Sequence, residues 1–212
     1  MTMKPILYLD AGHGGLHPQT GRYLTAPAKL FKHKKGDFHQ GGLFFEGVSN
    51  RIIAGKLELA VEDLVQVVRL YHDWKDTGLM ERVNTANRHW YAGKKPAAVG
   101  ISFHSNAAGK PGSGSGWEVF TSPGRTKSDR YADILWEEVK KIYPGPMREE
   151  RADGDHDKEA KLTMCTRTDM PFVLSENLFF DNFEEANLLI DPEFQNILIG
   201  AYRESIKRWF SL

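Results

Sequence analysis

Short apolar runs along the chain alternate with longer segments in which apolar residues recur every three or four positions. The runs predict buried strands, and the repeats predict helices. We expect strands at residues 6–9, 65–71, 97–103, 117–120 and 171–175. We expect helices at residues 48–64, 80–91, 128–142 and 192–210. Strands that alternate with helices indicate an α/β fold with a central, largely parallel, twisted sheet flanked by helices.

Two of the expected helices have an apolar face whose residues can be named in advance. The first repeats apolar residues at Val48, Ile52, Ile53, Leu57, Ala60 and Leu64. The terminal helix is expected to turn inward Phe194, Ile197, Leu198 and Ala201. Faces of this width normally cover a sheet or another helix.

Residues 16–45 show no clear period and are rich in Gly, Lys, His and aromatic residues. We interpret them as a long loop over the active-site face, because loops of this length in compact domains tend to be functional. The Gly/Ser stretch at 112–116 is interpreted as a flexible loop, since a strand-like segment follows it directly. Residues 1–212 are therefore predicted to form a single domain.

Charge composition bears on the class of binding partner, and cysteine content bears on disulfide formation. The 212 residues include 28 basic and 28 acidic side chains, so nothing indicates nucleic acid or an anionic membrane as a partner. The single cysteine excludes an intrachain disulfide. We see no signal-peptide core and no membrane span, and we expect a monomer made in the cytoplasm.

Four short segments carry the candidate chemistry. They read Asp-Ala-Gly-His-Gly-Gly at 10–15, Phe-Glu-Gly at 45–47, Ile-Ser-Phe-His-Ser-Asn-Ala at 101–107 and Met-Pro-Phe-Val-Leu-Ser-Glu at 170–176. Two histidines and one carboxylate are a ligand set that leaves a position on zinc free for water. A second carboxylate can take that water's proton. His13, His104 and Glu176 each follow a predicted strand, which places them at the carboxyl ends of a parallel sheet.

Each of these residues also has a simpler interpretation. His13 can be incidental to a glycine turn, and His104 can be a hydrogen-bonded core histidine. Glu46 can simply favour the start of a helix through the helix dipole. For Glu176 the functional interpretation is stronger, because a buried carboxylate is unfavourable unless it is paired or near a metal.

Other residues are weaker candidates for a catalytic, metal-binding or substrate-binding role. We interpret Cys165 as a packing or surface residue, because no motif surrounds it. Asp153, Asp155 and Asp157 lack the Gly and Glu of a calcium loop and are expected in a solvated loop. The basic cluster at 32–35 is expected to be solvated, with acidic polymers as the alternative partner. We expect no structural metal at His17, His33, His39, His72, His89 and His156, although His17 and His39 are near enough in sequence to contact substrate.

Together the segments resemble the zinc-dependent N-acetylmuramoyl-L-alanine amidases, bacterial and phage enzymes that cut peptidoglycan between sugar and stem peptide. The resemblance runs from about residue 6 to the terminal helix. Residues 10–15 resemble the first zinc motif, Glu46 with Asn50 the second, and residues 102–107 the third. Residues 170–176, with Phe179 and Asn182, resemble the segment of the catalytic glutamate. The remaining similarities are Arg82 with Ala86 and Asn87, and residues 116–120.

The resemblance implies that His13, Glu46 and His104 bind Zn²⁺ and that Glu176 is the catalytic acid–base. It further implies substrate contacts by Asn106 and Arg82. The substrate would be peptidoglycan, reached after release from the cytoplasm through a membrane opened by another protein or by lysis. An endolysin and a bacterial autolysin both fit this description.

Two features depart from the family pattern, and two other functions stay open. Leu178 stands where the family usually has a glycine, and the 16–45 loop is long. The alternatives are a zinc peptidase that acts on the stem peptide and a wall-binding module without turnover. The residues alone argue only for a zinc hydrolase.

Overall fold

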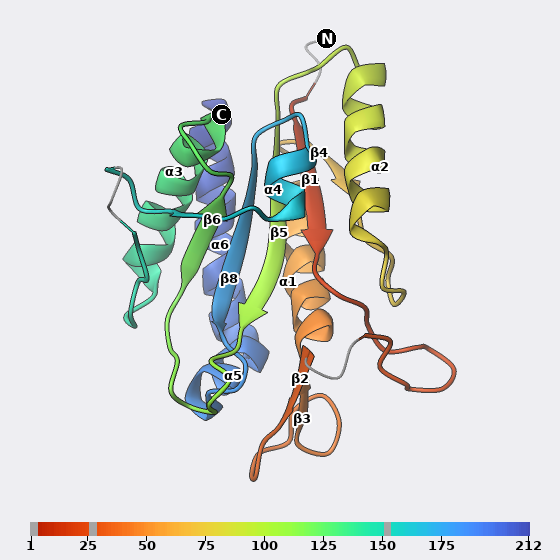
Figure 1. Ribbon diagram of the computed structural model, residues 1–212, viewed down its shortest axis with the longest axis vertical. Helices are drawn as coiled ribbons and strands as arrows, with labels where there is room; N and C mark the ends of the chain where they lie inside the picture. The colour runs from red at the N-terminus through yellow and green to blue at the C-terminus, as the bar shows by residue number, and fades with distance from the viewer. Residues whose placement is uncertain (1–3, 26–28, 151–153) are drawn as a thin grey trace.

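Six strands form a central sheet in the computed structural model, which describes residues 4–25, 29–150 and 154–212 (Figure 1). In spatial order the strands are β4 (Gln66–Arg69), β1 (Ile6–Ala11), β5 (Ala98–Asn106), β8 (Phe172–Phe179), β6 (Glu118–Thr121) and β7 (Lys158–Glu159). All neighbouring strands are parallel except β6, which runs antiparallel to β8. The prediction of an α/β fold with a largely parallel sheet is confirmed.

Helices cover both faces of this sheet (Figure 1). One face carries α1 (Glu46–Val61), α3 (Lys127–Ile142) and α6 (Pro192–Phe210), with α5 (Phe183–Ile190) directly before α6. The other face carries α2 (Leu79–Ala92) and the short α4 (Thr163–Arg167). A separate antiparallel hairpin joins β2 (Leu30–Lys32) to β3 (Leu43–Phe45), directly before α1. In the part of the chain that the structure describes, no helix has the length and apolar character needed to cross a bilayer.

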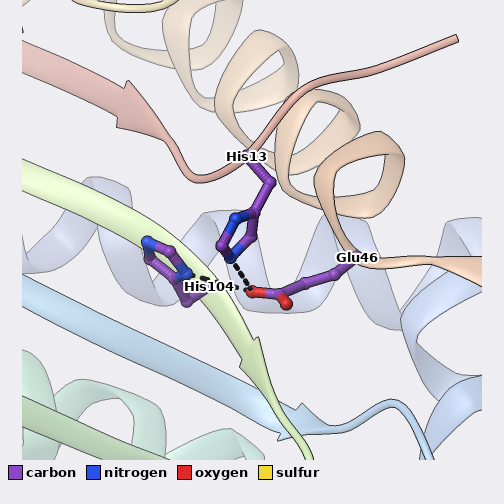
Figure 2. Close-up of side chains that lie close together, drawn as sticks. All are labelled: His13, Glu46 and His104. Atoms are coloured by element: carbon purple, nitrogen blue, oxygen red, sulfur yellow. Dashed lines mark hydrogen bonds and ion pairs between the residues drawn. The ribbon is translucent and has the colours of Figure 1, made fainter. Parts of the chain in front are cut away.

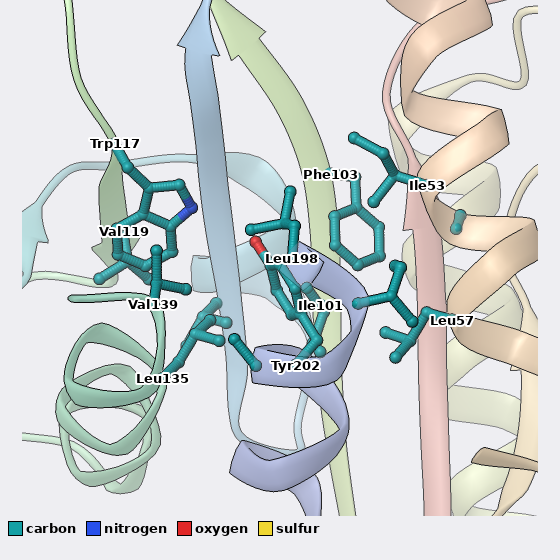
Figure 3. Packing of buried hydrophobic residues seen from close by; sticks show 14 of the residues in the cluster. Ile53, Leu57, Ile101, Phe103, Trp117, Val119, Leu135, Val139, Leu198 and Tyr202 are labelled. Carbon is teal, nitrogen blue, oxygen red and sulfur yellow. The ribbon is translucent and has the colours of Figure 1, made fainter. Parts of the chain in front are cut away.

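Alternate residues of β1 supply two separate apolar clusters. Leu7 and Leu9 belong to the larger cluster, which α1, α3 and α6 complete. Figure 3 shows this packing, with Ile53 and Leu57 from α1 beside residues of β5 and α6. Tyr8 points to the opposite face, where it packs with residues of α2 and α4. Because side chains alternate along a strand, one short apolar run serves both layers.

Two strands run further than the sequence predicts, and this changes where the site residues lie. β5 continues to Asn106 and β8 to Phe179, so His104 and Glu176 lie within the strands rather than after them. Polar residues interrupt the apolar run, but parallel pairing of His104 with Glu176 keeps the backbones in the sheet. The two side chains therefore have the fixed orientation of strand residues.

Several other expectations were wrong. Ile197 was expected to face the core but is 45% exposed, since α6 presents Phe194, Leu198 and Ala201 to the sheet instead. Asp157 was expected in a solvated loop but is 2% exposed, and its carboxylate accepts a hydrogen bond of 2.5 Å from Thr121 Oγ1. Asp153 lies outside the described residues. The elements that the sequence pattern did not predict are β2, β3, β7, α4 and α5.

Cys165 is a packing residue. It is buried, and its Sγ donates to the carbonyl oxygen of Phe120 at 3.7 Å. Burial raises the pKa of the thiol to about 12, which keeps it protonated and unreactive at neutral pH.

Leu178 has a backbone conformation that normally favours glycine. Its φ is 61°, in the left-handed region, and the strand register shifts at this point between β5 and β8. The side chain is nevertheless 1% exposed and belongs to the large apolar cluster. The leucine thus keeps the bend that a glycine would favour and adds a buried side chain to the core.

We predict that Leu178→Gly lowers the free energy of unfolding. The change relieves about 1–2 kcal/mol of left-handed strain but loses a buried side chain worth about 2–5 kcal/mol. Urea unfolding in the presence of a chelator measures the difference, with the exposed Leu59→Ala as the control. A Leu178→Gly protein at least as stable as the wild type would show that backbone strain outweighs packing.

Candidate metal centre

Three side chains from distant segments converge at the carboxyl ends of β1 and β5 (Figure 2). His13 follows β1, Glu46 begins α1, and His104 lies near the end of β5. His13 Nε2 is 3.1 Å from Glu46 Oε1, and His104 Nδ1 is 3.0 Å from the same oxygen. One ligand atom from each residue lies within 4.8 Å of the others. Imidazole nitrogens and a carboxylate oxygen at this separation can hold a divalent metal ion.

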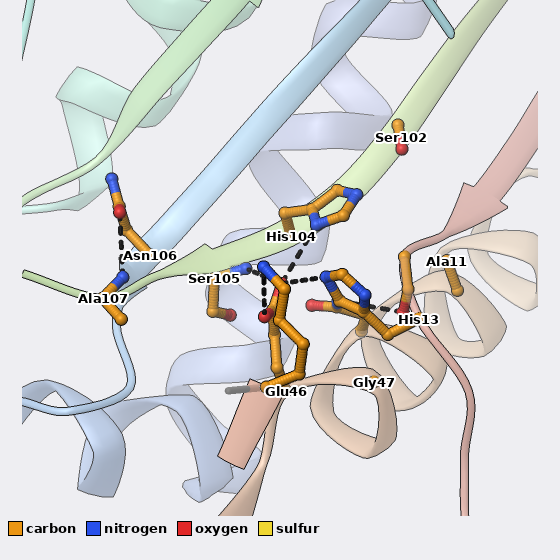
Figure 4. A network of polar contacts seen from close by, with 12 residues as sticks. Ala11, His13, Glu46, Gly47, Ser102, His104, Ser105, Asn106 and Ala107 are labelled. Carbon is orange, nitrogen blue, oxygen red and sulfur yellow. Dashed lines mark hydrogen bonds and ion pairs between the residues drawn. The ribbon is translucent and has the colours of Figure 1, made fainter. Parts of the chain in front are cut away.

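The charges of this cluster depend on one another. Burial disfavours the Glu46 carboxylate, but hydrogen bonds from His104 and His13 outweigh it and lower the pKa of Glu46. Burial also disfavours a charged His104, yet the hydrogen bond to Glu46 outweighs it and raises the pKa of His104. The Ser105 backbone N–H donates to Glu46 Oε1 at 3.3 Å (Figure 4). The other carboxylate oxygen, Glu46 Oε2, has no hydrogen-bond partner among the described residues.

Glu176 lies on the next strand, directly opposite His104 in the register of β5 and β8. Its Oε2 is buried and accepts no hydrogen bond from any described residue. Burial is the main reason that the pKa of Glu176 is raised, and the neighbouring carboxylates Glu46 and Glu118 add to the effect. A bound cation acts in the opposite direction, because it favours the ionised carboxylate. Glu176 thus has the surroundings of an acid–base group whose charge responds to a metal beside it.

The backbone at His13 is held in an unusual conformation by groups from two helices. His13 has a φ of 66°, in the left-handed region that residues other than glycine seldom adopt. Its carbonyl oxygen accepts from Arg51 Nη2 at 2.7 Å and from Arg82 Nη2 at 3.3 Å. The preceding carbonyl, of Gly12, accepts from Asn50 Nδ2 at 3.3 Å. These contacts fix the direction in which the imidazole leaves the loop.

Arg82 is the central group of this support. It is 2% exposed, and its Nη1 donates to Asp10 Oδ1 at 2.5 Å and to the Ala11 carbonyl at 2.7 Å. The other oxygen of Asp10 accepts from Ser102 Oγ at 2.5 Å. The ion pair therefore joins α2, the end of β1 and the middle of β5 at the base of the site.

Glycine at position 12 is required by His104. A Cβ on Gly12 would lie 2.2 Å from the His104 ring, so any side chain would displace this ligand. The missing side chain at Gly12 therefore lets the loop of His13 pack closely against the second histidine.

The 16–45 segment contacts the start of α1, where Glu46 lies. Tyr23 Oη accepts from the Gly47 backbone N–H at 3.0 Å, and His39 Nδ1 accepts from the Phe45 N–H at 2.8 Å. Burial lowers the pKa of His39 to about 4, so the ring is neutral and able to accept. Lys29 Nζ lies 3.7 Å from Glu46 Oε2. Sequence reasoning missed these roles, because no local pattern marks a contact with a helix that begins up to 23 residues later.

The structure brings together four of the six predicted site residues directly: His13, Glu46, His104 and Glu176. Asn106 lies at the end of β5, with Nδ2 donating to Glu118 Oε1 at 2.5 Å. Arg82 lies behind His13 and lines a cavity of about 350 Å³ beside His13 and His104. Substrate contacts by Asn106 and Arg82 stay predictions. His17, the other histidine considered for substrate, packs against Trp74.

Comparison with protein families gives a match over nearly the whole chain. Residues 7–208 match a family described as N-acetylmuramoyl-L-alanine amidase. An endolysin of Bacillus phage SPP1 is 30% identical over 220 residues, covering 99% of this chain and 68% of the relative. The N-acetylmuramoyl-L-alanine amidase CwlM of Bacillus licheniformis is 30% identical over 135 residues, covering 63% of this chain and 47% of the relative.

Solved structures share the fold at lower sequence identity. The N-acetylmuramoyl-L-alanine amidase of Clostridium difficile 630 has a TM-score of 0.73 at 20% identity, with 99% of this chain and 98% of that chain covered. Ami1 from Mycobacterium smegmatis has a TM-score of 0.74 at 19% identity, with 99% and 98% covered. At this identity the similarity supports the fold alone.

We predict that Arg82→Met destabilises the protein by about 3–5 kcal/mol, because it leaves the Asp10 carboxylate buried without its cation. The double variant Asp10→Asn/Arg82→Met should lose less stability, since no unpaired charge remains. Urea unfolding in the presence of a chelator measures the free energy of unfolding of both variants. Arg69→Met is the control, because its ion pair with Glu58 is partly exposed and worth at most about 1 kcal/mol. Equal losses in Arg82→Met and Arg69→Met would contradict a central role for the buried pair.

Proposed function

Because this chain belongs to the N-acetylmuramoyl-L-alanine amidase family, we propose that it works with a zinc ion held by His13, Glu46 and His104. The chain is an enzyme that cleaves the amide between N-acetylmuramic acid and L-alanine of peptidoglycan, in cell wall lysis. The observation that supports the zinc proposal most strongly is the convergence of two imidazole nitrogens and one carboxylate within 4.8 Å.

The donor set fits zinc better than a hard cation. Calcium and magnesium prefer shells of oxygen ligands, whereas two imidazoles with one carboxylate suit zinc and leave a coordination position open. Glu46 Oε2 has no hydrogen-bond partner among the described residues, and the nearest cation is Lys29 Nζ at 3.7 Å, so the carboxylate would be available to a metal ion. When bound, zinc polarises the scissile carbonyl and lowers the pKa of its water.

Glu176 is the proposed acid–base residue of the reaction. Its place opposite His104 puts a carboxylate beside the metal ligands without making it one of them. In the proposed sequence Glu176 takes a proton from the attacking water and gives it to the leaving amine of L-alanine. Its Oε2 has no hydrogen-bond partner in the described part of the chain, which leaves one oxygen free for this transfer. Acid–base catalysis of this kind typically contributes a factor of about 10²–10⁴.

A cavity beside the proposed metal ligands supports a placement for the acyl part of the substrate. It is lined by His13, His104 and the turn at residues 76–79 before α2, on the β1 side of the cluster. Glu176 lies on the opposite side of His104, on β8. We therefore place the muramoyl group in this cavity and the leaving peptide on the Glu176 side.

We further propose that the enzyme is a monomer that reaches the wall from within the cell. It would be made in the cytoplasm and released when the membrane is opened. The support for this route is the relative from Bacillus phage SPP1, which is named an endolysin.

Purified protein should carry about one zinc per chain, because three ligands with an open position are enough to hold the ion. His13→Ala and His104→Ala should lose metal and activity together, since each removes one of three ligands. Elemental analysis after dialysis measures the metal, and His17→Ala, which packs on Trp74, is the matched control. Full zinc occupancy in both ligand variants would rule out this ligand set.

Glu176→Gln should stay folded and zinc-loaded but lose turnover by about a hundredfold or more, because it keeps the shape and removes the base. The assay labels new amino termini and new reducing sugars in one peptidoglycan digest. The wild type should release L-alanine amino termini and leave the glycan strands whole. New termini within the stem peptide would indicate a peptidase instead, and activity of Glu176→Gln within a few-fold of wild type would exclude an acid–base role.

A further inference from the structure

A row of charged side chains crosses the sheet on the face that carries His104, one of the proposed metal ligands. His104 pairs with Glu176 between β5 and β8, and Glu176 pairs with Glu118 between β8 and β6. Because residues directly opposite in neighbouring strands share a face, the three side chains lie side by side. Lys158, on the next strand β7, reaches the same row through its contact with Glu118. The row therefore continues past Glu176, away from the metal ligands.

Among the described residues, Glu118 and the two cations that contact it carry together one more positive than negative charge. Glu118 is 2% exposed, and its Oε2 accepts from Arg148 Nε at 2.9 Å and from Lys158 Nζ at 2.5 Å. Its other oxygen accepts from Asn106, an uncharged donor. Two cations thus meet one buried carboxylate. A positive charge remains beside the proposed path of the substrate.

The guanidinium of Arg148 carries a positive charge in a geometry that can bind a carboxylate. Its Nε is used by Glu118, and its Cζ lies 5.1 Å from the centre of the Phe179 ring. Neither terminal nitrogen hydrogen-bonds to any residue that the structure describes, and the side chain is 39% exposed. The guanidinium is therefore fixed on one edge by Glu118 and Phe179, while its other N–H groups are open to solvent. A planar guanidinium fork matches a carboxylate in geometry as well as in charge.

The proposed direction of proton transfer determines which part of the substrate lies near the Arg148 guanidinium. Glu176 gives its proton to the amine of L-alanine, so the peptide leaves on the Glu176 side of the metal. Arg148 lies further along the same row, beyond Glu118. We propose that Arg148 is a specificity-determining residue that binds a free carboxylate on the stem-peptide residue after L-alanine. This inference rests on the proposed function, because it takes the direction of the peptide from the role of Glu176.

The test compares two muramoyl pentapeptides that differ only in the residue after L-alanine, which carries either a free carboxylate or a carboxamide. Wild-type enzyme should show a higher kcat/KM for the carboxylate, by about tenfold to a hundredfold, the range for a charge-assisted hydrogen bond. Arg148→Met should abolish this preference by slowing only the carboxylate substrate. Arg148→Lys should restore part of it, since the charge returns without the fork.

Lys158→Met is the matched control, because Lys158 contacts the same oxygen of Glu118. A purely structural role for the cations would make both variants lose activity on both substrates equally. The proposal expects Lys158→Met to keep the carboxylate preference, whatever its total activity. Equal rates of wild type on both substrates, or an Arg148→Met enzyme that keeps the preference, would overturn the subsite while leaving the amidase function intact. If wild type cuts neither substrate before L-alanine, the proposed function and the subsite fail together.

Discussion

The buried ion pair between Asp10 and Arg82 is the contact on which the geometry of the site depends. It joins the end of β1 to α2, and through Ser102 it also reaches β5. Neither charge is exposed to solvent, so each relies on the other for stabilisation. The remaining donors of Arg82 fix the carbonyl groups of Ala11 and His13. This buried charge pair therefore sets the position of His13, the first of the proposed metal ligands.

The pairing of strands in the sheet sets the distances between the other residues of the site. His104, Glu176 and Glu118 occupy paired positions on three adjacent strands, and neighbouring strands lie about 4.8 Å apart. The proposed metal ligand His104, the proposed acid–base residue Glu176 and Glu118, which anchors Arg148, are thus separated by single strand spacings. Arg148 and Lys158 both come from the chain after α3, Arg148 from the segment before β7 and Lys158 from β7 itself, and they meet at the Glu118 carboxylate of the reversed strand.

The sequence predicted the strands and helices well wherever apolar residues have a clear period, as at 6–9 and 192–210. The α/β fold followed from the alternation of strands and helices, and the family followed from four segments with local signatures, including the glycines around His13. What it could not predict depends on contacts between distant positions. Tyr23 and His39 support a helix that follows them in sequence, and Asp157 is buried by a neighbouring strand. Leu178 was visible only as a departure from the family pattern. Its left-handed φ shows that the bend is kept without the glycine.

The support of the three proposed ligands by other protein groups has a consequence for how the metal is acquired. Arg51 and Arg82 hold the loop of His13, Tyr23 and His39 hold the helix start at Glu46, and the sheet holds His104. In small zinc domains the ligands meet only when the ion binds, so metal uptake and folding are one event. Here each proposed ligand is also held by protein groups, so we expect the domain to fold before it takes up its metal ion. Folding and metal loading would then be separate steps, and the activity of the folded protein would depend on the local supply of the metal ion.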